Sequence, residues 1–459
     1  MEMIFSVANK HVVVIGAGRS GSAAAALLVS RGARVTLADS GQTPPGDASR
    51  LRGLGVTIEL GVHRPDLTTS ADLVVVSPGV PPTVAVLAAA RRAGVPVIGE
   101  VELASRWLAG RVVAVTGTKG KSTTTTLAAR MLQEGGIDVT AGGNLGTALS
   151  TQVDGSSPEA IHVVEVSSFQ LESTDTFHPW IAVLVNLSPD HLDRHASFAE
   201  YAAAKARIFR NQTEADWAVV NADDSGAMEL AAGTRARRFD FALEAPIQSG
   251  VTIEGDQIVR RNQGSSVPLV PVAAVRLPGR HLLADVLAAT AVSALAAAPA
   301  AAMTRAVEGF MGLEHVLELA GDIDDVRFVN DSKATNIAAA GRAIESFDRH
   351  LVVIMGGRYK GGAFEDLREV VRDRVDAVVT IGEAQDRIAD ALGAVTPVYH
   401  ASSMDDAVRR GFALTSPGGV VLLAPACSSF DMFSDYAARG RAFKESVSRL
   451  AAEVRPTRA

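Results

Sequence analysis

The chain has 459 residues, of which 47% are apolar and 21% are charged, the balance of a globular enzyme and not of a disordered segment. At about 150 residues per domain, this length predicts about three domains, each with its own core. The net charge is −7 and no block of basic residues forms a positive face, so we expect no nucleic acid partner. The only cysteine, Cys427, excludes an internal disulfide framework and favours a reducing cytoplasm.

The first section of the chain alternates strand and helix patterns, as parallel α/β domains do. A strand at 11–15 leads into the turn Gly16-Ala17-Gly18-Arg19-Ser20-Gly21, and a helix pattern covers 22–31. A second strand, at 34–38, ends at Asp39. This Gly-x-Gly-x-x-Gly run, followed by a later acidic residue, is the dinucleotide-binding fingerprint, which predicts a tight turn but does not identify the ligand. A nicotinamide-dependent oxidoreductase is therefore one alternative for the chain.

A second glycine turn, Gly117-Thr118-Lys119-Gly120, separates a strand at 111–115 from a helix pattern at 121–134. Backbone N–H groups and the helix N-terminus would face a phosphate there. Lys121 would reach the outer phosphates of a nucleotide, and the Ser122 hydroxyl would hold Mg²⁺. We therefore expect this shortened P-loop to bind ATP.

The middle of the chain continues as a second α/β section, with strand patterns at 161–166, 181–187 and 217–221. A polar, β-rich interval at 239–277 predicts a hairpin insertion. The uncharged, alanine-rich stretch 286–304 contains Pro299. We expect a buried helix that ends near this proline, and no membrane span.

Three side chains of this section suit a metal site. Glu165 stands near the end of a strand beside the expected ATP loop, where a carboxylate can ligate Mg²⁺. His191 lies in a loop with two histidines and two aspartates within six residues, which favours a metal or phosphate role, whereas His195 has no preferred role. Lys205 lies among small apolar residues, where poor solvation would lower its pKa and leave a neutral amine that CO₂ could carbamylate. A solvated helix lysine is the alternative, and the residues themselves do not decide between the two.

The third section, from about residue 312, predicts a further α/β domain with strands at 326–329, 351–355, 377–381 and 420–423. Polar loops follow three of these strands, at 330–333, 356–362 and 426–431. This is the edge of a parallel sheet at which ligands bind. Lys333 and Lys360 lie in these loops, so a role in a site is favoured over a role as surface charges.

Several motifs resemble those of the Mur ligases, the amide ligases of peptidoglycan precursor synthesis, and the resemblance spans nearly the whole chain. The motifs are Gly117 to Thr123, Glu165-Val166-Ser167-Ser168-Phe169-Gln170-Leu171-Glu172, Asp190-His191-Leu192-Asp193-Arg194, Asn330-Asp331-Ser332-Lys333-Ala334-Thr335 and Pro425-Ala426-Cys427-Ser428-Ser429-Phe430-Asp431. The resemblance implies an ATP-dependent carbon–nitrogen ligase that joins D-glutamate to UDP-N-acetylmuramoyl-L-alanine through an acyl phosphate. It implies a cytoplasmic monomer that serves cell-wall synthesis, and with it cell shape and cell division.

The resemblance also implies three domains and a set of site residues. Residues 1–101 would form a Rossmann-like domain for the UDP-substrate, 102–311 a central P-loop ATPase-type α/β domain, and 312–459 a Rossmann-like domain for the amino acid. The ATP residues would be Gly117, Thr118, Lys119, Gly120, Lys121, Ser122, Thr123, Asp285 and Asp331. The UDP-substrate residues would be Gly18, Ser20, Asp39, Ser40, Gly79, Asn144, Ser167 and Gln170. The amino-acid residues would be Lys333, Thr335, Lys360, Ser429 and Phe430.

For catalysis, the resemblance implies Lys121, Glu165, His191 and Lys205. Two Mg²⁺ ions would be held, one by Ser122 and Glu165 and the other by His191 and carbamylated Lys205.

Three positions depart from the family's pattern. Val316 stands where an arginine that reaches ATP is common, Asp285 where asparagine is frequent, and Gly41 where an arginine is often found near uridine. No metal ligand or phosphate lysine is lost, so we expect an active enzyme. The alternatives are another Mur-type or folylpolyglutamate-type ligase with a different amino acid or acceptor, and a non-catalytic ATP-binding regulator.

Overall fold

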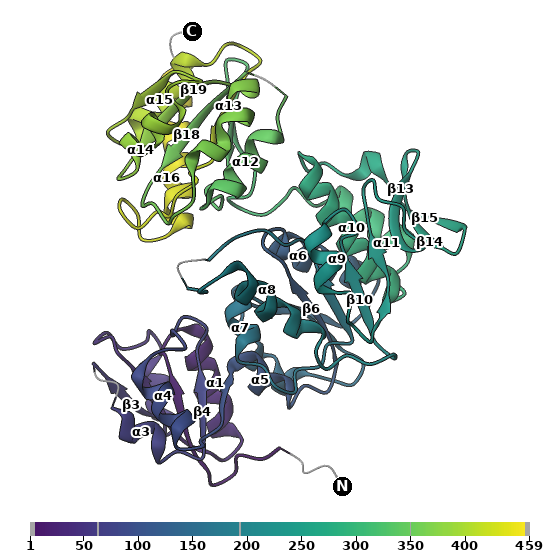
Figure 1. The fold of residues 1–459 in the computed structure, drawn as a ribbon, viewed down its shortest axis with the longest axis vertical. Helices are drawn as coiled ribbons and strands as arrows, with labels where there is room; N and C mark the ends of the chain where they lie inside the picture. Colours follow the sequence, from purple (N-terminus) through teal and green to yellow (C-terminus); the bar gives the residue numbers. More distant parts are fainter. Residues whose placement is uncertain (1–4, 62–63, 192–193, 349, 455–459) are drawn as a thin grey trace. The chain divides into compact units, whose positions relative to one another are not determined.

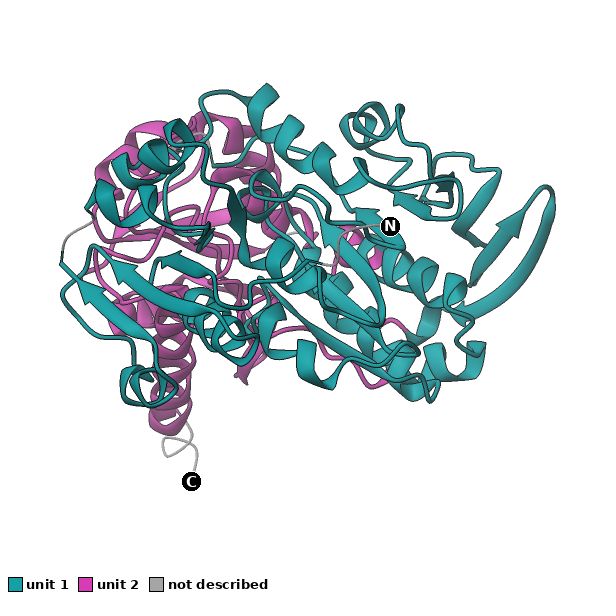
Figure 2. Cartoon of the chain, turned by 90° about the horizontal axis from the view of Figure 1, so that it is seen from below, with its two compact units in different colours: residues 1–274, 284–307 teal, residues 275–283, 308–459 magenta. Residues whose placement is uncertain are grey.

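The computed structural model describes residues 5–61, 64–191, 194–348 and 350–454 of the chain (Figure 1). The chain divides into two compact units, which are coloured separately in Figure 2. Unit 1 comprises residues 1–274 and 284–307, and unit 2 comprises residues 275–283 and 308–459.

The N-terminal part of unit 1 is a parallel sheet in the order β3-β2-β1-β4-β5. Its strands are β1 (His11–Ile15), β2 (Arg34–Asp39), β3 (Thr57–Leu60), β4 (Leu73–Val76) and β5 (Val97–Gly99). The helices are α1 (Arg19–Ser30), α2 (Ala48–Gly53), α3 (Pro65–Thr69), α4 (Ala85–Arg92) and α5 (Glu100–Ser105). The middle strand β1 is hydrogen-bonded on both sides and buried from Val12 onward, which is why its sequence is a continuous apolar run. The order of the strands confirms the Rossmann-like prediction.

The rest of unit 1 is built on a second parallel sheet in the order β11-β10-β9-β6-β8-β7. Its strands are β6 (Arg111–Thr116), β7 (Val139–Gly143), β8 (Ile161–Glu165), β9 (Ile181–Leu184), β10 (Trp217–Val220) and β11 (Arg237–Arg238). The helices are α6 (Lys121–Glu134), α7 (Ser168–Glu172), α8 (Phe198–Ala206) and α9 (Ser225–Leu230). Because β6 lies between β8 and β9, the ends of these three strands meet at one edge of the sheet, and the expected ATP loop leaves from this edge.

The interval predicted as a hairpin insertion forms a small four-stranded sheet, in the order β12-β13-β14-β15. Its strands are β12 (Asp240–Phe241), β13 (Ser249–Glu254), β14 (Gln257–Asn262) and β15 (Ser265–Pro271). The alanine-rich stretch forms two helices, α10 (Arg280–Leu295) and α11 (Ala300–Glu308), and Pro299 directly precedes the second. The break before this proline confirms the predicted helix end, but the prediction missed the second helix.

Unit 2 contains the third of the large sheets, in the order β16-β17-β21-β18-β19-β20, which is parallel except for its edge strand β16. Its strands are β16 (Glu318–Ile323), β17 (Val326–Asn330), β18 (Leu351–Gly356), β19 (Val375–Ile381), β20 (Val398–His400) and β21 (Val420–Leu423). The helices are α12 (Ile337–Glu345), α13 (Arg368–Arg374), α14 (Gln385–Leu392), α15 (Met404–Leu414) and α16 (Tyr436–Val454). The expected polar loops leave from β17, β18 and β21, which are neighbours in this sheet.

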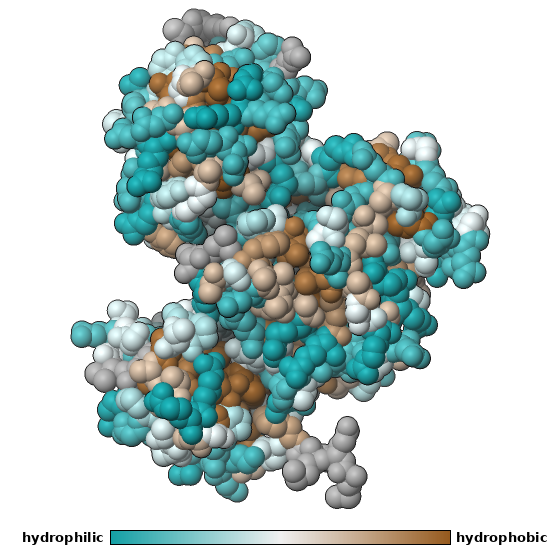
Figure 3. Space-filling model, viewed as in Figure 1, coloured by the Kyte–Doolittle hydropathy of each residue, from teal (hydrophilic) through white to brown (hydrophobic). Residues whose placement is uncertain are grey.

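The surface seen in Figure 3 is mostly hydrophilic, with apolar side chains in separate patches. The apolar residues of the strands are instead buried between the sheets and their helices. Among the residues that the structure describes, no helix combines the length and the apolar character that a membrane crossing needs.

Candidate active site

The expected ATP loop runs from the end of β6 to the start of α6. Gly117 and Gly120 have φ angles of 151° and 83°, a range that favours glycine. A Cβ atom on Gly120 would also overlap the carboxylate of Asp285, which comes from α10. The structure therefore brings Asp285 to the loop. The first N–H groups of α6 have no partner within the helix and can face a phosphate.

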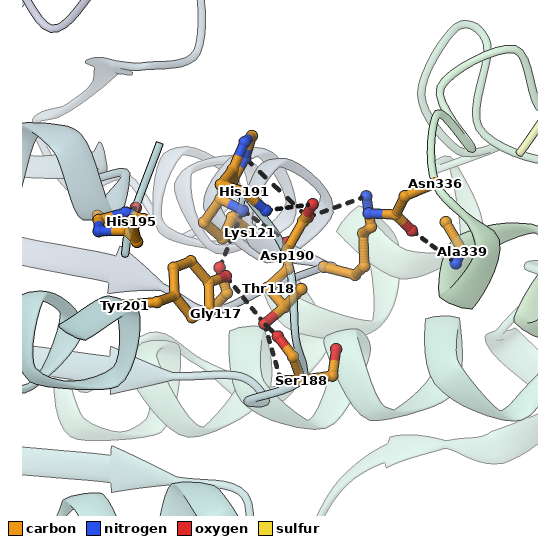
Figure 4. Close-up of polar contacts among 12 residues, drawn as sticks. Gly117, Thr118, Lys121, Ser188, Asp190, His191, His195, Tyr201, Asn336 and Ala339 are labelled. Carbon is orange, nitrogen blue, oxygen red and sulfur yellow. Dashed lines mark hydrogen bonds and ion pairs between the residues drawn. The ribbon is translucent and has the colours of Figure 1, made fainter. Parts of the chain in front are cut away.

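The segment that follows β9 holds this loop in position. Asn186 Oδ1 accepts hydrogen bonds from the N–H groups of Thr118 at 3.1 Å and of Lys119 at 2.9 Å. Thr118 Oγ1 donates to the Ser188 carbonyl at 3.0 Å and lies 3.0 Å from the Tyr201 hydroxyl (Figure 4). These bonds set the path of the loop backbone.

Two lysine side chains bind the same carbonyl of the loop. Lys121 Nζ donates to Gly117 O and Thr118 O, both at 2.9 Å, and Lys205 Nζ donates to Gly117 O at 2.8 Å. Lys205 is buried, with 1% of its surface exposed. Burial, and after it the charge of Lys121, holds the pKa of Lys205 well below its usual value. The lowered pKa makes the neutral amine of Lys205 more accessible than that of a solvated lysine.

A hydroxyl, a carboxylate and an amide meet beside the loop. Ser122 Oγ donates to Glu165 Oε2 at 2.6 Å, and Asn144 Nδ2 donates to Glu165 Oε1 at 2.8 Å. The carboxylates of Asp190 and Glu165 lie near enough to the Lys205 amine for their charges to raise its pKa, which partly offsets the lowering by burial. Hydroxyl and carboxylate oxygens are the ligands that Mg²⁺ prefers. Ser122 and Glu165 therefore fit a bound Mg²⁺.

His191 lies in the loop before α8, next to Asp190. Its backbone has φ of 55°, which is uncommon for a residue other than glycine. His191 Nε2 is 4.0 Å from Asp190 Oδ2, and Lys119 Nζ is 3.7 Å from the same oxygen. The His191 ring meets the Phe169 ring edge to face, with centres 4.9 Å apart. Residues 192–193, which belong to the same motif, lie outside the described residues.

His195, which has no role predicted from the sequence, is buried against α7. Its Nε2 is 3.0 Å from Ser168 Oγ, and its Nδ1 is 3.2 Å from Glu172 Oε1. Burial lowers the pKa of His195. The side chain therefore joins the loop of the expected metal ligand to α7.

The glycine turn after β1 has two tightly packed positions and one open position. A Cβ atom on Gly16 would lie 2.8 Å from the Ser77 Cβ atom, and one on Gly21 would overlap the Gly16 carbonyl oxygen. At Gly18, in contrast, none of the described atoms lies within 4 Å of an added Cβ. Gly18 therefore offers an open surface to a ligand, and half-buried Ser20 lies two residues further along the chain.

Asp39, at the end of β2, connects this turn to the next loop. Its Oδ2 accepts from the Ala17 N–H group and its Oδ1 from the Gly41 N–H group, both at 2.7 Å. Ser40 lies between them and is exposed. The carboxylate orders the edge of the sheet at which a nucleotide ligand would bind.

Gly79 lies between two carbonyl groups that bind Arg194. The guanidinium donates to Pro78 O at 2.8 Å and to Val80 O at 3.0 Å, and it lies 4.0 Å from the centre of the Phe169 ring. Arg194 thus joins the Gly79 loop to the loop of the expected metal ligand. The sequence alone predicts no function for this arginine.

Ser167 and Gln170 form a capping box at the start of α7. Ser167 Oγ accepts from the Gln170 N–H group at 3.3 Å, and Gln170 Oε1 accepts from the Ser167 N–H group at 2.9 Å. Their contact with a substrate stays a prediction, as does that of Asn144, which here binds Glu165.

The expected amino-acid residues lie on three loops of unit 2. The loop after β17 begins with buried Asp331 and carries Lys333 and Thr335. The loop after β18 carries exposed Lys360. The loop after β21 carries Ser429 and Phe430, of which Ser429 is buried and Phe430 is 60% exposed.

Backbone hydrogen bonds join these three loops. Ala426 donates to Ala334 O at 3.0 Å. Arg358 and Ser428 exchange N–H···O bonds of 2.9 and 3.0 Å. The structure therefore groups these residues at one edge of the third large sheet.

Three family models match the chain. The model described as "Mur ligase MurD-like, N-terminal domain" matches residues 10–99, "Mur ligase middle domain" matches 115–293, and "Mur ligase, glutamate ligase domain" matches 317–427. The chain belongs to the Mur ligase family. The three large sheets are accordingly those of the family's three-domain α/β fold, as the sequence predicted.

Relatives in this family cover nearly the whole chain. A protein of Acidobacterium capsulatum named UDP-N-acetylmuramoylalanine–D-glutamate ligase is 44% identical over 443 residues, which cover 96% of each chain. A protein of the same name from Pelotomaculum thermopropionicum is 41% identical over 449 residues, covering 97% of this chain and 99% of the relative.

Solved structures with the same fold are more distant in sequence. A pseudomurein peptide ligase type C from Methanothermus fervidus has a TM-score of 0.63 at 17% identity, covering 96% of this chain and all of that one. The MurF ligase of Thermotoga maritima in complex with ADP has a TM-score of 0.60 at 16% identity, covering 99% and 96%. At these identities the likeness concerns the fold.

Proposed function

We propose that this Mur ligase adds D-glutamate to UDP-N-acetylmuramoyl-L-alanine with hydrolysis of ATP to ADP and phosphate. The observation that carries this proposal is the near full-length identity of 44% and 41% to two ligases that bear this activity in their names. The local geometry supports it, because Lys121, Ser122, Glu165 and Lys205 gather around the loop that would hold ATP.

The reaction begins when an oxygen of the substrate carboxylate attacks the γ-phosphorus of ATP, which releases ADP and forms an acyl phosphate. Both reactants are anions, so cationic groups are needed where they meet. The Lys121 ammonium would supply one such charge, from its place over the Gly117 carbonyl. The D-glutamate amine then attacks the acyl carbon and loses a proton, and phosphate leaves as the amide forms.

Ser122 and Glu165 would hold one Mg²⁺, and His191 and Lys205 a second. Bound Mg²⁺ would offset the negative charge of the phosphates. Lys205 becomes an anionic oxygen ligand if its neutral amine adds to CO₂ and releases a proton to give a carbamate. The lowered pKa of Lys205, caused by burial and then by Lys121, makes the required neutral amine more accessible.

The UDP-substrate would lie along the open surface at Gly18, with Ser20, Asp39, Ser40 and Gly79 beside it. Asn144, Ser167 and Gln170 would contact its muramoyl-alanine part. Thr118, Lys119, Gly120, Thr123, Asp285 and Asp331 would contact ATP, while Lys333, Thr335, Lys360, Ser429 and Phe430 would surround D-glutamate. The domain limits 1–101, 102–311 and 312–459, a cytoplasmic location and a monomeric state belong to the same proposal.

The test is phosphate release from ATP and Mg²⁺ with UDP-N-acetylmuramoyl-L-alanine, in the presence of D-glutamate, L-glutamate or a panel of other amino acids. We expect release that depends on D-glutamate. Phosphate release with another amino acid would support the ligase reaction but show that D-glutamate is not the substrate. No phosphate release with any amino acid would overturn the proposed function.

A further inference from the structure

Arg439 is the largest side chain in the set of fully buried residues, with 1% of its surface exposed. It lies in the first turn of α16, and burial lowers its pKa to about 10, so it stays charged at neutral pH. Among the described residues, no carboxylate oxygen lies within 4.0 Å of its nitrogens. A buried cation without a carboxylate is costly unless other acceptors bind it, so its acceptors matter here.

Those acceptors lie on the three loops that carry the expected amino-acid residues. Nε donates to Ser332 Oγ at 3.0 Å and Nη2 to Ser332 O at 2.9 Å, on the loop after β17. Nη1 donates to Cys427 O at 3.1 Å, on the loop after β21, and reaches Gly356 O, at the end of β18, at 3.4 Å. Ser332 Oγ in turn donates to Tyr436 O at 2.7 Å, which ties the first loop back to α16.

The bonded atoms stand close in the chain to the residues that would bind D-glutamate. Lys333 follows Ser332 directly, Ser429 follows Cys427 by two residues, and Lys360 follows Gly356 by four. A planar guanidinium has donors in a fixed fork, which lysine cannot reproduce. One side chain thus fixes the spacing of three loops and places a permanent positive charge beneath them. A positive charge at this edge suits a dicarboxylate ligand.

We propose that Arg439 is the positioning residue of the amino-acid site in unit 2, and that it holds the three loops in register for a dicarboxylate amino acid. The identity of that ligand rests on the proposed function, whereas the joint ordering of the loops does not. The contact of Arg439 with the substrate is indirect, through Ser332, Cys427 and Gly356.

The test compares Arg439→Lys and Ser332→Ala with Ser446→Ala. Ser446 is a buried serine on α16 whose hydroxyl bonds to Ala442 O and Arg449 of the same helix and to Asp405, and which makes no hydrogen bond to the three loops among the described residues. Loss of a hydrogen bond to a charged group predicts a rise of about tenfold or more in the KM for D-glutamate in both test variants. We expect the KM values for ATP and the UDP-substrate to stay within about twofold, and Ser446→Ala to behave as wild type. Equal changes in all three KM values, or no change for D-glutamate, would overturn the proposal.

Amide hydrogen exchange of the same variants is independent of activity. We expect residues 331–335, 356–360 and 426–430 to exchange faster together in Ser332→Ala, and not in Ser446→Ala. If only the first of these loops changes, Arg439 does not hold the loops in register. Ser332→Ala decides the outcome should Arg439→Lys fail to fold. A wild-type protein without D-glutamate-dependent phosphate release would contradict the proposed function, while the exchange result would still test the positioning role.

Discussion

Glu102 is a fully buried carboxylate at the junction between the first two sheets, and its replacement by glutamine tests how much this junction contributes to stability. Oε1 accepts from Arg106 Nε at 2.8 Å and from Thr176 Oγ1 at 2.6 Å. Oε2 accepts from the N–H groups of Asp175 at 2.8 Å and Phe177 at 2.9 Å. The carboxylate on α5 therefore binds the loop that follows α7 with both oxygens.

Glutamine keeps only one of the two oxygens. If Oε1 becomes NH₂, Arg106 Nε loses its acceptor, while the Thr176 hydroxyl can turn and accept; if Oε2 does, two backbone N–H groups lose theirs. Each buried donor left without an acceptor costs about 1–3 kcal/mol, so the loss of one or two should lower the free energy of unfolding of Glu102→Gln by about 1–6 kcal/mol. For a unit of this size, that loss corresponds to a fall in Tm of roughly 2–10 °C.

The assay is differential scanning calorimetry of Glu102→Gln beside Glu214→Gln, which replaces an exposed glutamate. Burial raises the pKa of Glu102, but its hydrogen bonds to Thr176, Asp175 and Arg106 outweigh burial and lower the pKa overall. A lowered pKa stabilises the fold above the unfolded value of about 4.3, and the effect is lost as pH falls through the folded value. The Tm difference from wild type should therefore shrink in acid. Equal Tm values for the two variants at neutral pH would refute this reasoning.

Three further results follow from the geometry. Gly18→Ala should leave Tm unchanged and weaken binding of the UDP-substrate, measured by titration calorimetry. Gly21→Ala should instead lower Tm, since its Cβ would overlap the Gly16 carbonyl oxygen. The same Tm in both variants would contradict this expectation. Lys205→Ala should abolish ligation, with partial recovery in formate or acetate as carbamate mimics, and full activity without an additive would exclude the carbamate. Burial raises the pKa of Cys427 to about 12, so its thiol should resist iodoacetamide at about pH 8. Rapid alkylation of the native protein, detected by mass spectrometry, would contradict its burial.

Much of the fold could be predicted because the chain marks its parallel strands with apolar runs and ends them in glycine turns. The predicted ends of the helices and strands agree less well with the structure. Helix α1 begins at Arg19 and not at Ser22. Gly21 is therefore part of the helix, where its backbone packs against the Gly16 carbonyl, and is not the last residue of the preceding turn. Strand β16 was missed, since Glu318–Ile323 contains two acidic residues and a glycine among three apolar ones and is exposed or half-buried at all but its last position, as at the edge of a sheet.

The local parts of the site could also be read from the sequence. Small neighbours allowed a buried Lys205 but did not decide between it and a solvated one, and the structure buries it. The acceptor of its hydrogen bond, Gly117 O, lies in the loop after β6, far away in the sequence, so no pattern near Lys205 predicts this bond. Tyr201 precedes Lys205 by four residues on α8, and its ring centre lies 4.6 Å from Lys205 Nζ. Because residues four apart on a helix are neighbours, the sequence could have predicted this contact. Arg439 had no such signal, because its partners come from three distant loops.

The central claim is that the substrate carboxylate is activated by ATP before the amine attacks it. The most direct measurement labels that carboxylate of UDP-N-acetylmuramoyl-L-alanine with ¹⁸O and analyses the phosphate released in the presence of D-glutamate. We expect one ¹⁸O atom in each phosphate, because the bridging oxygen of the acyl phosphate leaves with phosphorus. Phosphate without the label would contradict it.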